Sequence, residues 1–128
     1  MSEAASFHPG AFESTSGGPV LLGSRCGSCG QHYHPRAAAC LNCGAAALDD
    51  VRLSRQGRLE CCTTVHMPTA TMDAPYTVGY VQLPEGLRIF APIRGAAAAL
   101  KVGATMTLAD FTIGRGDRQR SAYCFVSA

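Results

Sequence analysis

CGSCGQHYHPRAAACLNCG, residues 26–44, decides the fold of this chain because its four cysteines form two C-x-x-C pairs. The pairs are Cys26 with Cys29 and Cys40 with Cys43, and ten residues separate them. Each pair is followed by a glycine, which lets the backbone N–H groups turn toward the sulfur atoms and reverses the chain. A tetrahedral set of four thiolates suits zinc or iron. The segment is too short to bury a core, so we expect the metal to fold it.

The four cysteines also predict the role of the metal. A catalytic zinc keeps one coordination position open for water, whereas four thiolates close the coordination shell. The sequence therefore predicts a structural site. His32 and His34 lie beside the first pair, but we expect them to flank a short strand at 31–35, with Tyr33 packed inward, and not to bind the metal.

The composition is that of one small globular domain, or of a metal-bound unit joined to a modest second one. The chain has 128 residues, a net charge of +2 and a pI near 8.2, an imbalance too small to predict binding to nucleic acid or to an anionic membrane. No stretch has the roughly 18 apolar residues of a membrane span, and the N-terminus lacks the regions of a signal peptide. We therefore expect a cytoplasmic protein whose seven cysteines stay reduced.

After Gly44 the chain alternates short strand-like segments with turn-like separators. The segments cover residues 58–66, 76–84, 87–95, 104–113 and 121–128. Five strands at this density predict a small closed barrel, for which the OB-fold is the five-stranded candidate. The loop at 95–103 has room for one helical turn. The predicted fold class is all-β.

The residues before the first cysteine pair are weakly specified. Residues 14–19 are rich in turn-forming types, and only VLLGS at 20–24 is typical of a strand. We expect a lead-in at 1–19, a zinc ribbon at 20–50 and a barrel domain at 51–128. Phe7 and Phe12 are the apolar exceptions in the lead-in, and they either pack locally on the ribbon or dock on another subunit.

The order of several motifs resembles that of the DUF35 family. The motifs are GSRCGSCGQHYHPRAAACLNCG at 23–44, the glycine of RQGRL at 55–59, APY at 74–76, LPEG at 83–86 and KVGATMTL at 101–108. The likeness covers residues 20–128. It implies a rubredoxin-like zinc ribbon followed by a five-stranded OB-fold barrel, in a protein that works with acyl-CoA beside a thiolase-fold subunit. Family members commonly begin with a helix, whereas GGPV at 17–20 interrupts any helical pattern here.

The remaining cysteines do not form a catalytic arrangement. Cys61 and Cys62 face opposite sides of one expected strand. His66 shares a face with Cys62 but lies about 13 Å along the strand, beyond hydrogen-bonding reach. We expect these two cysteines and Cys124 to be small apolar fillers or exposed bystanders, and the sequence predicts no catalytic residue.

Arginines in the second half of the chain offer a candidate ligand site. They are Arg94, Arg115, Arg118 and Arg120. The last three surround an expected hairpin turn, where they either stay solvated or hold the phosphates of a CoA nucleotide by charge-assisted hydrogen bonds.

The resemblance implies a non-catalytic subunit of a thiolase, acyltransferase or aldolase complex. Zinc would then be structural, acyl-CoA would be a ligand, and two copies would flank a thiolase dimer through the ribbon and the N-terminus. Two other classes stay open. A single-stranded nucleic-acid-binding module would use Tyr76, Tyr80 and Phe90 as stacking platforms. A rubredoxin-like electron carrier would bind iron with the same four cysteines.

Overall fold

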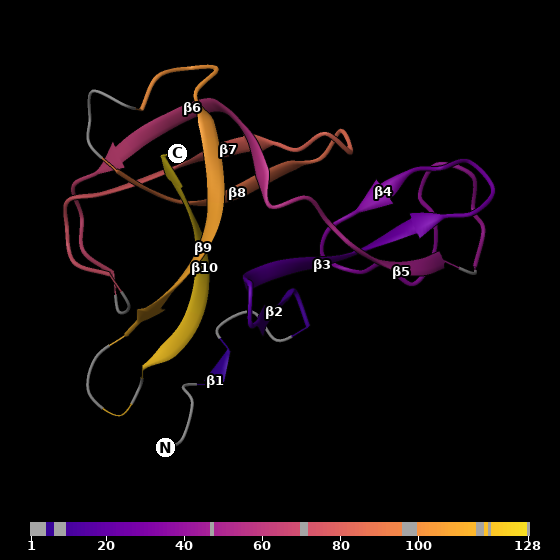
Figure 1. Cartoon of the computed structure of the whole chain (residues 1–128), viewed down its shortest axis with the longest axis horizontal. Coiled ribbons are helices and arrows are strands. Elements are labelled where there is room, and N and C mark those ends of the chain that lie inside the picture. Colours follow the sequence, from indigo (N-terminus) through magenta and orange to yellow (C-terminus); the bar gives the residue numbers. More distant parts are fainter. Residues whose placement is uncertain are drawn as a thin grey trace.

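The computed structural model describes residues 5–6, 10–46, 48–69, 72–95, 100–114, 117 and 119–127. These residues contain ten strands, joined by turns and loops (Figure 1). These residues contain no α-helix, and so none that is long and apolar enough to cross a membrane. The all-β class is confirmed. The helical turn expected in 95–103 falls largely on residues 96–99, which lie outside the described residues.

Five strands close into a barrel in the second half of the chain. They are β6 (Gln56–Val65), β7 (Tyr76–Gln82), β8 (Arg88–Arg94), β9 (Thr105–Ile113) and β10 (Arg120–Ser127). The pairs β6–β7, β7–β8, β6–β9 and β9–β10 are antiparallel, and a parallel pairing of β10 with β8 closes the barrel. All five expected strands are therefore present in an OB-like barrel. The short strand β1 (Ala5–Ser6) pairs in parallel with the start of β10.

Alternation of apolar and polar residues explains the barrel core. In β8, for example, Ile89, Ala91 and Ile93 are buried, whereas Arg88 before them and Phe90 between them are exposed. The inward residues of the other strands join the same cluster, among them Leu59, Val81, Met106, Leu108 and Phe125. Burying one such large side chain contributes about 1.5–3 kcal/mol, so this cluster is the main source of stability.

The zinc-ribbon part is organised around one central strand. β3 (Gly18–Cys26) pairs antiparallel with β2 (Phe12–Thr15), β4 (His32–Tyr33) and β5 (Leu48–Arg52). The ordered strand therefore begins before the expected residues 20–24. The boundaries expected at 19/20 and 50/51 fall inside β3 and β5, and this division of the chain stays a prediction.

Strand β2 gives regular structure to a segment that the sequence leaves weakly specified. Its ladder with β3 runs from Phe12 opposite Leu21 to Thr15 opposite Gly18, so only Ser16 and Gly17 form the turn. Ser-Gly is a turn-forming pair, and a two-residue connection between paired antiparallel strands makes a hairpin. The turn-forming residues at 14–19 thus mark a hairpin and not a loose tail.

The burial of Phe12 decides between the two alternatives that its sequence position leaves open. Its side chain is 7% exposed, and its ring meets that of Tyr123 on β10 edge-on, with 5.5 Å between the centroids. Phe12, Leu21 and Leu53 belong to the same cluster as the barrel residues. Phe12 therefore holds the first strands of the chain against the barrel and is not an anchor for another subunit. Phe7 lies outside the described residues.

Candidate metal centre and barrel groove

Two knuckles of identical backbone geometry carry the cysteines. In each, the N–H of the first cysteine donates to the carbonyl five residues later, and the N–H of the glycine donates to the carbonyl of that cysteine. In the first knuckle, the hydrogen bond from Cys26 to Gln31 is 2.9 Å long and that from Gly30 to Cys26 is 2.8 Å long. In the second knuckle, the hydrogen bond from Cys40 to Ala45 is 2.8 Å long and that from Gly44 to Cys40 is 2.9 Å long. Both glycines have φ near +80°, which only glycine adopts readily. The chain reversal predicted at these glycines is confirmed, and the N–H of Cys43 donates to Sγ of Cys40 at 3.4 Å, whereas the N–H groups of the glycines donate to carbonyls.

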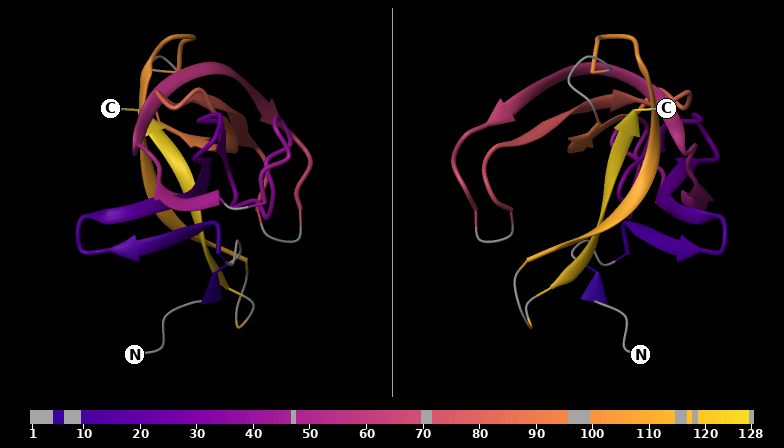
Figure 2. Two further views of the ribbon diagram at one scale, coloured as in Figure 1. Left: turned by 90° about the vertical axis from the view of Figure 1, so that its right-hand side faces the viewer. Right: turned by 60° about the vertical axis from the view of Figure 1, so that its left-hand side comes forward.

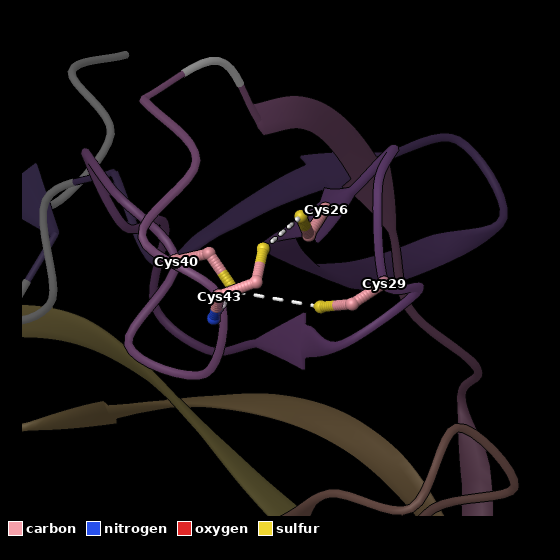
Figure 3. Close-up of side chains that lie close together, drawn as sticks. All are labelled: Cys26, Cys29, Cys40 and Cys43. Atoms are coloured by element: carbon pink, nitrogen blue, oxygen red, sulfur yellow. Dashed lines mark hydrogen bonds between the residues drawn. The ribbon is translucent and has the colours of Figure 1, made fainter.

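The knuckles bring the four sulfur atoms together (Figure 3). All four Sγ atoms lie within 4.8 Å of one another, and the pairs Cys26–Cys43 and Cys29–Cys40 are 3.5 Å apart. Four thiolates around zinc at 2.3 Å would be about 3.8 Å apart. The donor set therefore fits one tetrahedral ion. Neither His32 nor His34 belongs to this group of side chains.

Tyr33 connects strand β4 to the cysteine cluster. Its hydroxyl lies 3.2 Å from Sγ of Cys40 and accepts a hydrogen bond of 2.9 Å from the N–H of Leu41. The hydroxyl donates to the sulfur when Cys40 is a thiolate, because a thiolate has no proton to donate. This hydrogen bond lowers the pKa of Cys40 to about 6 and raises the pKa of Tyr33. The sequence predicts an inward Tyr33, but it gives no sign that this residue would contact a metal ligand.

His34, the next residue, connects the same strand to the barrel. Its Nε2 atom lies 3.1 Å from the carbonyl oxygen of Ala11, just before β2. Its ring also meets the ring of Tyr123 edge-on, with 6.0 Å between the centroids. The last residue of β4 and the residue after it thus contact the cysteine cluster and the barrel.

A groove at one end of the barrel contains one of the candidate arginines. Its volume is about 440 Å³, and residues from 72–77, 92–95 and 111–113 line it. Arg94 is exposed there, with its guanidinium carbon 5.3 Å from the centroid of the Phe111 ring. Arg120 is exposed and lies opposite Ile113 in the β9–β10 ladder, although its own side chain does not line the groove. Arg115 and Arg118 lie outside the described residues.

The three other cysteines occupy positions of two kinds. Cys61 and Cys62 are exposed on β6. Cys124 is buried on β10, and this burial raises the pKa of its thiol. A raised pKa lowers the thiolate fraction at neutral pH. For the three cysteines predicted to be small apolar fillers or exposed bystanders, the structure thus buries Cys124 and exposes Cys61 and Cys62.

Two family models match adjacent parts of the chain. The model described as the rubredoxin-like zinc ribbon domain of ChsH2 covers residues 19–49, and the model described as its C-terminal OB-fold domain covers residues 50–112. The boundary between the two models lies in β5, next to the boundary expected from the sequence.

Curated relatives share much of the same region. Subunit BbsA of benzoylsuccinyl-CoA thiolase is 39% identical over 97 residues in Thauera aromatica and 36% identical over 91 residues in Geobacter metallireducens. These matches cover 74% and 70% of this chain, and 67% and 62% of those proteins. A DUF35 domain-containing scaffold protein of Methanothermobacter thermautotrophicus is 33% identical over 76 residues, which are 57% of either chain. This chain thus spans between about half and two thirds of the length of these relatives.

Solved structures show the same fold. A chain of the structure described as the Ltp2-ChsH2(DUF35) aldolase matches with a TM-score of 0.71 at 24% identity, over 84% of each chain. A protein of the DUF35 family from Sulfolobus solfataricus matches with a TM-score of 0.54 at 18% identity, over 70% of this chain and 67% of that one. With its ribbon, its barrel and its relatives taken together, the chain belongs to the DUF35 family.

Proposed function

We propose that this chain is a non-catalytic subunit of a thiolase-type acyl-CoA enzyme, in which a thiolase-fold partner supplies the catalytic residues. The observation that carries the proposal is the 39% identity to a benzoylsuccinyl-CoA thiolase subunit, over 97 residues that make up 74% of this chain. The burial of Cys124 and the raised pKa of its thiol support an accessory role, because a buried protonated thiol is a poor nucleophile.

The metal has a structural role in this proposal. Cys26, Cys29, Cys40 and Cys43 ligate one zinc ion, which cross-links the two knuckles and has no free position for a substrate. Tyr33 steadies the ligand Cys40 by its hydrogen bond, as outer hydrogen-bond partners of metal ligands commonly do. The ribbon then presents a rigid surface to the partner.

The barrel groove is the proposed place for acyl-CoA. Arg94 lies at its edge, where a guanidinium can form charge-assisted hydrogen bonds with phosphate oxygens. Arg115, Arg118 and Arg120 follow the adjacent strand β9 in the sequence and are proposed to contact the same nucleotide. A groove of about 440 Å³ is within the size range of small-molecule sites, which supports this assignment.

Co-expression with the thiolase-fold protein encoded nearest to this chain tests the proposal. We expect co-elution in size-exclusion chromatography, a mass that corresponds to two copies on a thiolase dimer, and acyl-CoA cleavage that requires both proteins. Separate elution, with the thiolase-fold protein fully active alone, would refute the accessory role. Replacing Arg94 with Ala should raise the KM for acyl-CoA and leave the complex intact, which tests the groove separately.

A further inference from the structure

Strands β6 and β7 stay paired beyond the part of β6 that contacts β9. This two-stranded arm is defined here as residues 61–69 and 72–80, of which Thr77 to Tyr80 also pair with the barrel strand β8. Up to Leu59, buried and exposed residues alternate along β6, but after an irregularity in pairing between Leu59 and Cys61 the next four residues are all exposed. The ladder nevertheless continues to Val65 opposite Tyr76. Figure 2 shows the paired strands curving away from the barrel. Both faces of β6 are therefore open to solvent along the arm.

The outer edge of the arm has no strand beside it in the described structure. β9 pairs with β6 only at residues 56–58, and two hydrogen bonds of Leu59, with Gly103 and Ala104, end this contact. β7 occupies the opposite edge of β6. Alternate residues within 61–65 therefore present backbone N–H and C=O groups outward, while those between them bond to β7. Such an edge is a template for another strand, and proteins usually protect it with charges, proline or a covering segment.

The side chains of this edge do not protect it. Residues 61–72 include no Asp, Glu, Lys or Arg, and the edge itself reads Cys-Cys-Thr-Thr-Val, which favours β-structure. Met67, near the end of the arm, is 75% exposed. An uncharged, unpaired edge is suited to strand addition by a protein whose own edge is also uncharged. Nucleic acid or an anionic membrane would instead require cations here.

The position of the arm indicates which protein adds a strand to its free edge. Five residues of β7 and the segment before it, between Met72 and Thr77, form one wall of the groove that contains Arg94. A protein bound along the free edge of β6 would lie one strand away from this groove, where acyl-CoA is proposed to bind, because β7 separates the two. We propose that the arm, through the free edge of β6 at residues 61–65, docks on an uncharged strand edge of the thiolase-fold subunit. This inference rests on the proposed function and adds the contact surface.

Charged substitutions on the arm test the inference. Thr63 and Thr64 are exposed, so Thr63→Lys and Thr64→Lys leave the fold and the zinc content unchanged. Thr105→Lys on β9 is the matched control, because Thr105 is an exposed strand residue outside the arm. Calorimetric titration with the thiolase-fold subunit should show binding at least about tenfold weaker for the two arm variants than for the wild type and the control.

Hydrogen exchange supplies a second measurement that requires no variant. Amides of residues 61–65 should exchange more slowly in the complex than in the free chain, because strand addition protects them. Unchanged affinity of both arm variants, or unchanged exchange at 61–65, would refute the arm contact while the proposed function stands. A homodimer of the free chain that Thr63→Lys abolishes would assign the edge to a second copy instead. A wild-type chain that does not bind would refute the proposed function and this inference together.

Discussion

Two adjacent residues, the last of β4 and the one that follows it, link the metal cluster to the rest of the molecule. Tyr33 reaches Cys40, while His34 reaches Ala11 and Tyr123. The chain at this point therefore takes part in two separate networks. Because the networks differ, substitutions at the two positions should have different effects.

Removing the Tyr33 hydroxyl should weaken metal binding. In Tyr33→Phe, Cys40 loses the donor that stabilises its thiolate, and the N–H of Leu41 loses its acceptor. Loss of such an outer hydrogen bond lowers metal affinity about 10–100-fold. Competition with a chromophoric chelator measures the change, with Tyr80→Phe as the control because Tyr80 is exposed on β7. Equal zinc affinity in both variants would show that the hydroxyl does not support the site.

Replacing His34 should lower stability without removing zinc. In His34→Ala the carbonyl of Ala11 loses the hydrogen bond from His34 but keeps the one from the N–H of Leu22, and the ring contact with Tyr123 is lost as well. Loss of a partly buried hydrogen bond costs about 1–2 kcal/mol. Urea denaturation measures this loss, and atomic absorption should still find one zinc per chain. A variant with less zinc would instead make His34 a ligand, which its absence from the cysteine cluster argues against.

Thiol reactivity should separate the seven cysteines into three classes. Cys61 and Cys62 are exposed and should react with a disulfide reagent within seconds at pH 8. The four zinc-bound thiolates should react after chelation. Cys124 should react last, on unfolding, because burial blocks access and raises its pKa, so that less thiolate exists at any given pH. A third fast thiol in the zinc-bound protein, absent from Cys124→Ala, would contradict the buried position.

At the scale of the elements, the sequence predicts those strands whose pattern is strong. The barrel strands alternate clearly, as in RIFAPIR of β8, and their positions are correct to within about two residues. β5 escapes prediction because LDDVR carries three charges and pairs at the edge of the small ribbon sheet. β2 escapes because its neighbours Ser16 and Gly17 resemble a loop. Phe12 of β2 packs against Tyr123, which is more than a hundred residues away in the sequence, so no local pattern predicts this contact.

The metal site was predictable in its ligands but not in its surroundings. Both C-x-x-C pairs and their glycines follow from local spacing alone. The contact of Tyr33 with Cys40 depends on how β4 is placed against the second knuckle, which spacing does not determine. The same holds for the groove, because Arg94 and Phe111 meet only once the barrel closes.

Truncating Phe12 should destabilise the whole chain. Phe12→Ala removes a buried ring that packs on Tyr123, and such substitutions cost about 3–5 kcal/mol. Leu41→Ala is the control, since Leu41 is 90% exposed and its loss should change the free energy of unfolding by less than about 0.5 kcal/mol. Urea denaturation compares the two. Equal stability would place Phe12 outside the core, and a deletion of residues 1–19 would then be a clean test of partner binding.

At the scale of the molecule, the ribbon and the barrel share one hydrophobic core. Phe12, Leu21 and Leu53 pack in the same cluster as Leu59, Val81 and Phe125. β3 contributes Leu21 to that core and ends at the ligand Cys26, so one strand spans the distance between the core and the metal. The cluster of sulfur atoms and the barrel are therefore joined by packing as well as by sequence.

This shared core predicts that metal removal weakens the barrel too. A ligand that binds only the folded state stabilises it by roughly 4 kcal/mol at a concentration 1,000 times its Kd, so a chelator or Cys40→Ser should lower the free energy of unfolding of the whole chain. Hydrogen exchange can follow residues 26–44 and β8 separately. Both should lose protection together on chelation, while Cys62→Ser keeps both protected. Loss confined to residues 26–44, with β8 unchanged, would show that β3 and His34 do not transmit the effect, and that the ribbon unfolds independently of the barrel.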